Sequence, residues 1–157
     1  REQFMFLRDN AIVTQTDITA FLSRTEETLA GLLKQRTILN VRKKKRRKLY
    51  AALADVDALA PAKVCYEAGL SGMESEFSQY MEAVSTLERC GVPREQLMTE
   101  KAEVYRRLAE LNHQIRQARR EKALCQEILG QIPQMEAELQ KTETKEREVR
   151  NNEHRRR

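Results

Sequence analysis

Apolar residues recur along most of this 157-residue chain at alternating steps of three and four, which places them on one face of an α-helix. Phe4 to Ile12 predict a short helix that docks on another element, for which residues upstream of Arg1 are one candidate. Thr16 and Asp17, residue types that cap helices, precede a long stripe made of Ile18, Leu22, Thr25, Leu29, Leu32, Arg36 and Leu39. No segment alternates apolar and polar residues over the length of a strand, so we expect an all-α fold.

Two further stripes flank Gly91 and Pro93, which suit the end of one helix and the first turn of the next. The first stripe comprises Met73, Phe77, Tyr80, Val84 and Leu87. The second has heptad spacing, weakened at Lys101 and Lys122, and comprises Leu97, Val104, Leu111, Ala118 and Cys125. Because a short connection favours antiparallel neighbours, we expect an antiparallel helical hairpin over residues 73–129, in an elongated coiled-coil bundle.

Prolines and glycines set the expected boundaries. Pro61 is an outer limit for the helix before it, and Gly130 with Pro133 interrupts the helix of the second heptad stripe. We expect N-terminal helices over residues 1–60, a short helix and turn over 61–72, the hairpin plus a C-terminal helix over 73–150, and a basic frayed tail over 151–157.

The composition is 34% charged and only 5% aromatic, which is typical of long or paired helices. Cys65, Cys90 and Cys125 are odd in number and lack CxxC spacing, so we expect reduced thiols and a cytoplasmic location. No stretch approaches the roughly 20 apolar residues needed to span a bilayer, and no signal peptide opens the chain. Because the chain starts with Arg1 and not Met, we expect upstream residues in the natural protein.

The net charge of +5 is unevenly distributed, since residues 34–48 hold nine Lys or Arg and no acid. Within them lies a cationic run of seven consecutive residues: Arg42, Lys43, Lys44, Lys45, Arg46, Arg47 and Lys48. Seven residues wrap about two turns of a helix, so burying any face of the run would strand charges. We expect the run, whether helix or loop, to lie in water or on DNA or RNA phosphates, with an affinity that falls with salt.

Recognition of a base sequence does not follow from this run. Single-strand binders usually add stacking aromatic residues, and only Tyr50 is nearby in the sequence. Arg116, Arg119 and Arg120 share a helix face and form a second candidate for phosphate contacts. Plainer interpretations stay open: the run is a solvated helix, a linker, a localisation signal or a site for an acidic protein, and the three arginines merely flank a heptad seam.

Patterns for catalysis are missing from the sequence. His113 and His154 have no metal-type partners at helical spacing, so we expect no metal and no cofactor. The chain contains no HExxH, GxSxG, P-loop or GxGxxG motif. We therefore expect that this chain is not an enzyme and has no small-molecule substrate.

The order of several segments carries a family resemblance. These segments are Thr25 to Leu29 with Lys34 to Arg36, Tyr66 to Gly69, Cys90 to Val92, Leu97 to Leu111, Ile115 to Glu121, Leu124 to Leu129, and Glu153 to Arg156. Together they resemble, over nearly the whole chain, the C-terminal helical region of relaxases, the mobilisation nucleases of bacterial conjugative and integrative elements, particularly those of Firmicutes. In that family an N-terminal domain with a histidine cluster and a tyrosine nicks DNA, and nothing here matches that domain.

The resemblance implies a piece that lies beside a nuclease and contacts DNA, or that joins relaxosome or secretion partners. We therefore expect a non-catalytic accessory domain of a DNA-mobilisation relaxase, which binds DNA non-specifically through the cationic run and the face of Arg116, Arg119 and Arg120. The alternative is a structural coiled-coil module for self-association or protein docking, without nucleic-acid binding.

Overall fold

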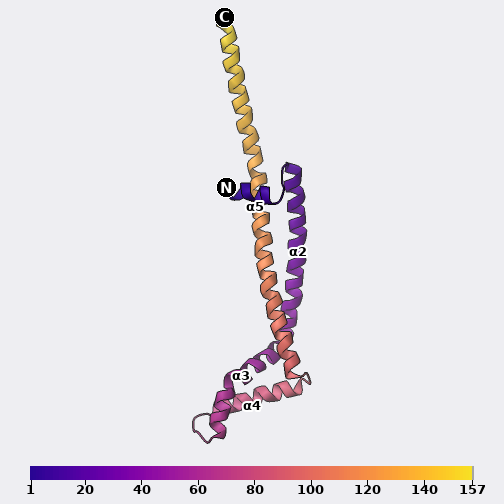
Figure 1. The fold of residues 1–157 in the computed structure, drawn as a ribbon, viewed down its shortest axis with the longest axis vertical. Helices are drawn as coiled ribbons and strands as arrows, with labels where there is room; N and C mark the ends of the chain where they lie inside the picture. Colours follow the sequence, from indigo (N-terminus) through magenta and orange to yellow (C-terminus); the bar gives the residue numbers. More distant parts are fainter. Residues whose placement is uncertain (157) are drawn as a thin grey trace. The chain divides into compact units, whose positions relative to one another are not determined.

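A computed structural model describes residues 1–156 of the chain, and over that range it is built from helices with no strand (Figure 1). The all-α prediction is therefore confirmed. The helices are α1 (Glu2–Asp9), α2 (Gln15–Lys45), α3 (Arg47–Glu67), α4 (Glu74–Arg89) and α5 (Arg94–Arg155). They form two compact units: unit 1 comprises Arg1–Gly31 with α5 from Ile115 onwards, and unit 2 comprises Leu32–Gln114.

Unit 1 is built on the packing of α1 and the first part of α2 against α5. Its core contains Phe6, Ile18, Cys125 and Ile128, with half-buried Leu7, Ile12, Phe21, Leu22, Leu124 and Leu129 around them. The rings of Phe6 and Phe21 meet edge to face, with centroids 5.3 Å apart. The short N-terminal helix therefore docks as predicted, and it docks on this chain itself. Lys122, a cation on the heptad seam, lies 4.0 Å from the Glu26 carboxylate.

The start of α2 is capped two residues earlier than predicted. Thr14 is the capping residue, because its Oγ1 accepts a hydrogen bond of 3.1 Å from the Asp17 amide. Asp17 returns the contact, since its Oδ2 accepts hydrogen bonds of 3.0 Å from the amides of Val13 and Thr14. The prediction of a cap at Thr16 and Asp17 was thus wrong in position, although Asp17 does take part. The hydrogen bonds from Val13 and Thr14 lower the pKa of Asp17.

Unit 2 contains α3, α4, the end of α2 and the start of α5. Its core is formed by Tyr50, Ala52, Leu53, Val56, Ala83, Leu87 and Leu97. Along α5 the heptad positions Val104, Leu108 and Leu111 are also buried, and Leu111 is fully so. Within this unit α2 and α5 run antiparallel, as shown by the contacts of Arg36 with Asn112 at 3.2 Å and of Arg46 with Glu100 at 3.3 Å.

The helices pair differently from the predicted hairpin. Residues 73–129 were expected to fold as two helices packed on each other; instead α4 packs on α3, and α5 packs on α2 (Figure 1). The lengths of the apolar stripes explain this choice. The seam of α5 buries residues from Leu97 to Ile128, which α2 with 31 residues can cover far better than α4 with 16 residues.

The two internal prolines end no helix. Pro61 lies inside α3, so most of the short helix predicted for residues 61–72 belongs to α3, and only the turn after Glu67 stands apart. Pro133 lies inside α5, which continues through Gly130 to Arg155, so the predicted interruption was wrong. Both prolines are exposed, and at an exposed position water can bind the carbonyl that loses its helical partner.

Gly91 ends α4, as the sequence predicted. Gly91 has a φ of +68°, in the left-handed region where residues with a Cβ are strained, and it stops α4 before Pro93 opens α5. At the turn between α3 and α4, Gly69 has a φ of +84°. The turn that contains Gly69 reverses the chain, so α4 packs back on α3 (Figure 1).

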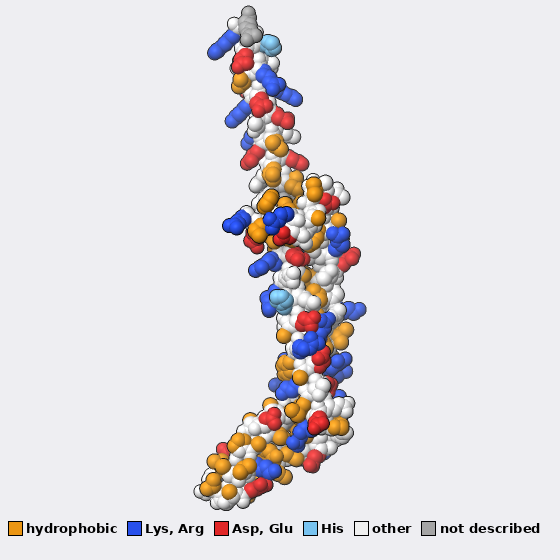
Figure 2. Space-filling model, viewed as in Figure 1, with side chains coloured by type: hydrophobic (Ala, Val, Ile, Leu, Met, Phe, Trp, Pro, Cys, Tyr) orange, Lys and Arg blue, Asp and Glu red, His pale blue; other side chains and the backbone are white. Residues whose placement is uncertain are grey.

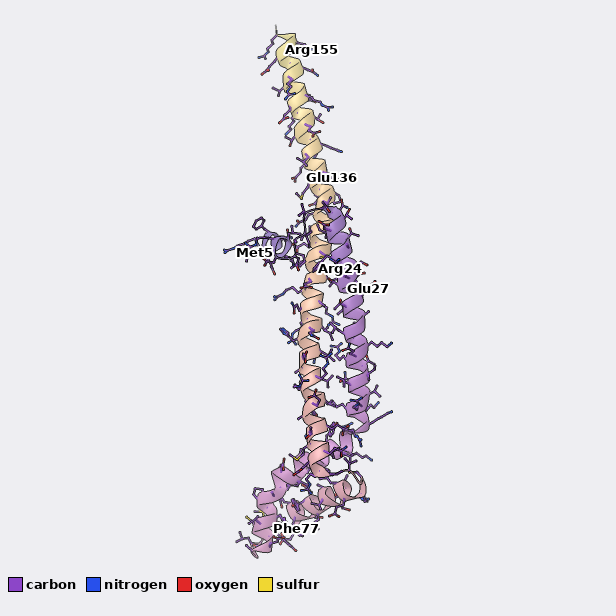
Figure 3. The ribbon with its side chains drawn as sticks, turned by 45° about the vertical axis from the view of Figure 1, so that its right-hand side comes forward. Met5, Arg24, Glu27, Phe77, Glu136 and Arg155 are labelled. Atoms are coloured by element: carbon purple, nitrogen blue, oxygen red, sulfur yellow. The ribbon has the colours of Figure 1, made fainter. Side chains whose placement is uncertain are left out.

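The last part of α5 has no packing partner among the described residues of unit 1. From Pro133 to Arg156 every residue is exposed, and side chains of both charges cover the segment (Figure 2). Glu136 and Arg155 project from this segment into solvent (Figure 3). Of the frayed tail predicted for residues 151–157, the part up to Arg155 is helix, and Arg157 lies outside the described residues. None of the helices within residues 1–156 has both the length and the apolar character to cross a bilayer.

Candidate nucleic-acid interface

The cationic run, Arg42 to Lys48, forms the junction between α2 and α3 in unit 2. The sequence left open whether it is helix or loop, and it is helix on both sides of a single turn residue, Arg46. The Arg46 amide donates to the Arg42 carbonyl at 3.1 Å, and the Tyr50 amide donates to the Arg46 carbonyl at 2.9 Å. Because these hydrogen bonds join the turn to both helices, the cations stand on helical backbone on either side of a bend.

Most of the run lies in water, as predicted. Five of its side chains are exposed and two, Lys43 and Arg46, are half-buried. Arg46 forms an ion pair of 3.3 Å with Glu100. In the part of the chain that the structure describes, the other six cations form no ion pair; they are Arg42, Lys43, Lys44, Lys45, Arg47 and Lys48. The junction therefore carries six positive charges that no carboxylate of these residues neutralises.

The start of α3 brings no negative side chain to the junction, because its first turn contains no acidic residue. The helix dipoles add little there, since the partial negative charge at the end of α2 lies beside the partial positive charge at the start of α3. The positive potential of the junction therefore comes from the Lys and Arg side chains themselves.

A cavity of about 510 Å³ lies beside the cationic run, between α2, α3 and α5 of unit 2. It is lined by Asn40, Lys43, Lys44, Arg47, Tyr50, Ala51, Ala54, Lys101 and Tyr105. Four of these residues are cations, and none is acidic. Apart from the cations and Asn40, its walls are two alanines and two aromatic rings, so the cavity combines positive charge with apolar surface.

Two residues of this cavity come from α5 and were not among the predicted site residues. The Lys43 ammonium lies 4.7 Å from the centre of the Tyr105 ring, and the Lys101 ammonium lies 5.9 Å from it. Lys101 also donates to the Tyr50 carbonyl at 3.4 Å. The sequence marked Lys101 only as a weak position of the heptad seam. The cation on the seam was the available signal, because it requires an acceptor or a route to water.

Tyr50 connects the cavity to the core of unit 2. It is 4% exposed, its ring centroid lies 6.4 Å from that of Tyr105, and its buried hydroxyl has no hydrogen-bond partner within the described residues. Burial raises the pKa of Tyr50, with the charge of Glu100 as the next cause. The phenol therefore keeps its proton at neutral pH and is a possible hydrogen-bond donor.

The second candidate set, Arg116, Arg119 and Arg120, lies on α5 in unit 1. All three side chains are exposed, and none is in an ion pair with another residue of the range 1–156. By contrast, Arg106 in unit 2 lies 2.6 Å from Glu103 and 3.2 Å from Glu110. The three arginines therefore form a cationic surface of unit 1.

Thiols and potential metal ligands do not cluster in the described part of the chain. Cys65, Cys90 and Cys125 are free thiols. Over the described range, no group of three or more His, Cys, Asp or Glu side chains is placed to hold a metal ion. Comparison of the chain with known protein families, with curated proteins and with solved structures found no match.

Proposed function

We propose that this chain is a non-catalytic helical module that binds nucleic-acid phosphates, DNA in particular, through the junction between α2 and α3. The observation that carries the proposal is the set of six cations of the run that are without a carboxylate partner among the described residues. Held on helical backbone, their side chains can reach phosphates without disturbing the core. Arg116, Arg119 and Arg120 provide further phosphate contacts from unit 1.

Binding of this kind is driven by the release of counterions. Each phosphate neutralised by Lys or Arg lowers the slope of log affinity against log salt by about 0.9 for duplex DNA. If all six free cations of the run made such contacts, the slope would approach about −5. Contacts to phosphates do not distinguish bases, so the expected binding is independent of duplex sequence.

We also propose a biological setting, the C-terminal helical region of a relaxase from a bacterial mobile element, acting in the cytoplasm. Its support is the order of sequence segments that resembles this family. In that setting the module holds DNA near the nuclease domain or docks relaxosome or secretion proteins. This setting predicts a histidine-rich nuclease domain upstream of Arg1 in the natural protein. If that domain were absent, the relaxase setting would be wrong, but the proposal of phosphate binding would stand.

Fluorescence anisotropy of labelled DNA with the full chain tests the binding proposal. We expect binding at about 50 mM salt and a loss of several orders of magnitude at about 200 mM if most of the cations make contacts. The double variant Lys44→Gln, Arg47→Gln should reduce the magnitude of the salt slope by about 1.8, because it removes two phosphate contacts of about 0.9 each. A matched double variant at exposed lysines of α5, Lys141→Gln with Lys145→Gln, is the control. Absence of binding at low salt would overturn the proposal.

A second candidate function is self-association through the end of α5. It is favoured by the exposure of Met135, Leu139 and Val149, at 59%, 63% and 57%, which share a stripe without a partner in the described part of the chain. A coiled coil with a second copy would bury that stripe. Analytical ultracentrifugation of the full chain separates the two functions: a concentration-dependent dimer without affinity for DNA would support this second one.

A further inference from the structure

We infer that the cavity lined by α2, α3 and α5 in unit 2 binds one nucleotide unit of a single-stranded nucleic acid, with its unpaired base on Tyr105 and its phosphate among Lys43, Lys44 and Arg47. This inference rests on the proposed function. It adds a specific site and a preference for single strands over duplex.

The lining of the cavity matches the two halves of a nucleotide. The cations supply donors for a phosphate, whereas Ala51, Ala54 and the ring of Tyr105 supply an apolar surface for a flat base. An inorganic phosphate would use only the charged part. The volume of about 510 Å³ lies within the range of about 300–1,000 Å³ usual for ligand sites. A paired base cannot leave its stack to enter the cavity without an energetic cost, so the site disfavours duplex.

The ring of Tyr105 is available for stacking. It is 44% exposed and makes no hydrogen bond within the described chain. Lys43 now holds its ammonium over the ring at 4.7 Å, but this long side chain can turn toward a phosphate. That movement would exchange a cation–π contact for a charged contact and would open the ring to a base. Cationic grooves with stacking aromatic residues are typical of proteins that bind single strands.

The ring is also held in place before any ligand arrives. Val104 and Leu108, on the same helix as Tyr105, are buried at 3% and 7% exposure, which fixes this part of α5. Lys101 ties α5 to α3 through the Tyr50 carbonyl. Tyr50, in the same lining, is packed into the core of unit 2 and is only 4% exposed. A site on packed helices loses little entropy when it binds.

The test uses the full chain and anisotropy with a labelled oligothymidylate of about 12 nucleotides and a duplex of the same length. Tyr105→Leu removes the stacking ring, and Ala54→Leu fills the cavity without changing a charge. We expect each to weaken single-strand binding roughly 5- to 30-fold, with duplex binding changed less than about 2-fold. Tyr105→Phe keeps the ring and should keep the affinity.

Tyr66→Leu is the matched control for loss of an aromatic ring. Tyr66 is 39% exposed, lies in unit 2 and stacks on Phe77 outside the cavity, so its loss should leave both affinities unchanged. Circular dichroism establishes that each variant retains its helices. If single strands and duplex bind equally and Tyr105→Leu changes neither, the inference about the cavity is wrong while the proposed function stands. If nothing binds at low salt, both are wrong.

A competition experiment distinguishes a strand from a free nucleotide, which shares the same chemistry. Thymidine monophosphate should displace the oligothymidylate only at concentrations far above the affinity for the strand, because it lacks the flanking phosphate contacts. Displacement at concentrations close to that affinity would overturn the assignment to a single strand.

Discussion

The guanidinium of Arg46 meets the carboxylate of Glu100 at the bend between α2 and α3, with Nε and Oε1 3.3 Å apart. Their side chains are 36% and 27% exposed, so solvent partly screens the pair. Within residues 1–156, Glu100 is the carboxylate that forms an ion pair with the cationic run, and it also ties the bend to the start of α5. Glu100 therefore has two opposed effects: its ion pair with Arg46 stabilises the fold, and its negative charge weakens the attraction of the junction for a polyanion.

Glu100→Gln should separate those effects. We expect the free energy of unfolding to fall by about 0.2–1 kcal/mol, as for other partly exposed ion pairs, because Arg46 loses its partner. The affinity for DNA should rise, because Arg46 becomes available and a negative charge leaves the junction. Urea denaturation and anisotropy measure the two quantities. Glu138→Gln, on the exposed end of α5, should change neither, and a weaker DNA affinity in the Glu100 variant would contradict the proposed interface.

Substitutions at Leu111 and Leu139 test a buried and an exposed heptad position of α5. Leu111 is fully buried, so Leu111→Ala should lower the free energy of unfolding by about 2–5 kcal/mol. Leu139 is 63% exposed, so Leu139→Ala should stay within about 0.5 kcal/mol for a monomer. Thermal or urea unfolding monitored by circular dichroism gives both values. A large, concentration-dependent loss in the Leu139 variant would instead support self-association through α5.

The reciprocal hydrogen bonds of Thr14 and Asp17 at the start of α2 should make the stability of the fold depend on pH in the acid range. The pKa of Asp17 is lowered in the folded chain, so its carboxylate binds protons less readily there than in the unfolded chain. Its stabilising effect is therefore fully present above the unfolded pKa of about 3.9 and is lost as pH falls through the lower folded pKa. Asp17→Asn should reduce the melting temperature at pH 7, and the difference from the natural chain should shrink toward pH 2. A difference that stays constant with pH would contradict this role of the carboxylate.

The three cysteines should react with alkylating reagents at unequal rates. Cys125 is fully buried in unit 1, and burial raises the pKa of its thiol, with the charge of Glu121 as a further cause. Since the thiolate is the reactive form, Cys125 should react much more slowly than the half-buried Cys65 and Cys90. Mass spectrometry after timed exposure to iodoacetamide measures this, and the three rates should converge in denaturant. Fast reaction of Cys125 in the native chain would show that the core of unit 1 opens readily.

Local features were predictable from the sequence because they depend on neighbours within one or two turns. The alternating steps of three and four placed Ile18, Leu29, Leu97 and Leu111 on buried helix faces, where the structure has them. Gly91 marked the end of α4 for the same reason, since only its own backbone conformation is involved. The exposure of the cationic run followed from the cost of burying seven charges.

Helix breaks were predictable only in part. Pro61 and Pro133 were expected to limit helices, and both lie inside them. A proline removes one hydrogen bond, and the remainder of a long helix can offset that loss when the position faces water. Whether the helix continues depends on the length and packing of the whole helix. The residues next to the proline carry no information about either.

The choice of helix partners was decided by tertiary structure. Periodicity shows which face of a helix is apolar, but several faces of similar character compete, and the amount of surface buried selects among them. The long apolar seam of α5 packs on α2, and α4 packs on α3 instead. That choice brings Tyr105 and Lys101 to a run of cations more than fifty residues earlier in the chain. The sequence by itself determined the helices, their apolar faces and the charge that must stay in water, because these depend on local spacing. Only packing between distant segments could decide that an aromatic ring stands beside that charge.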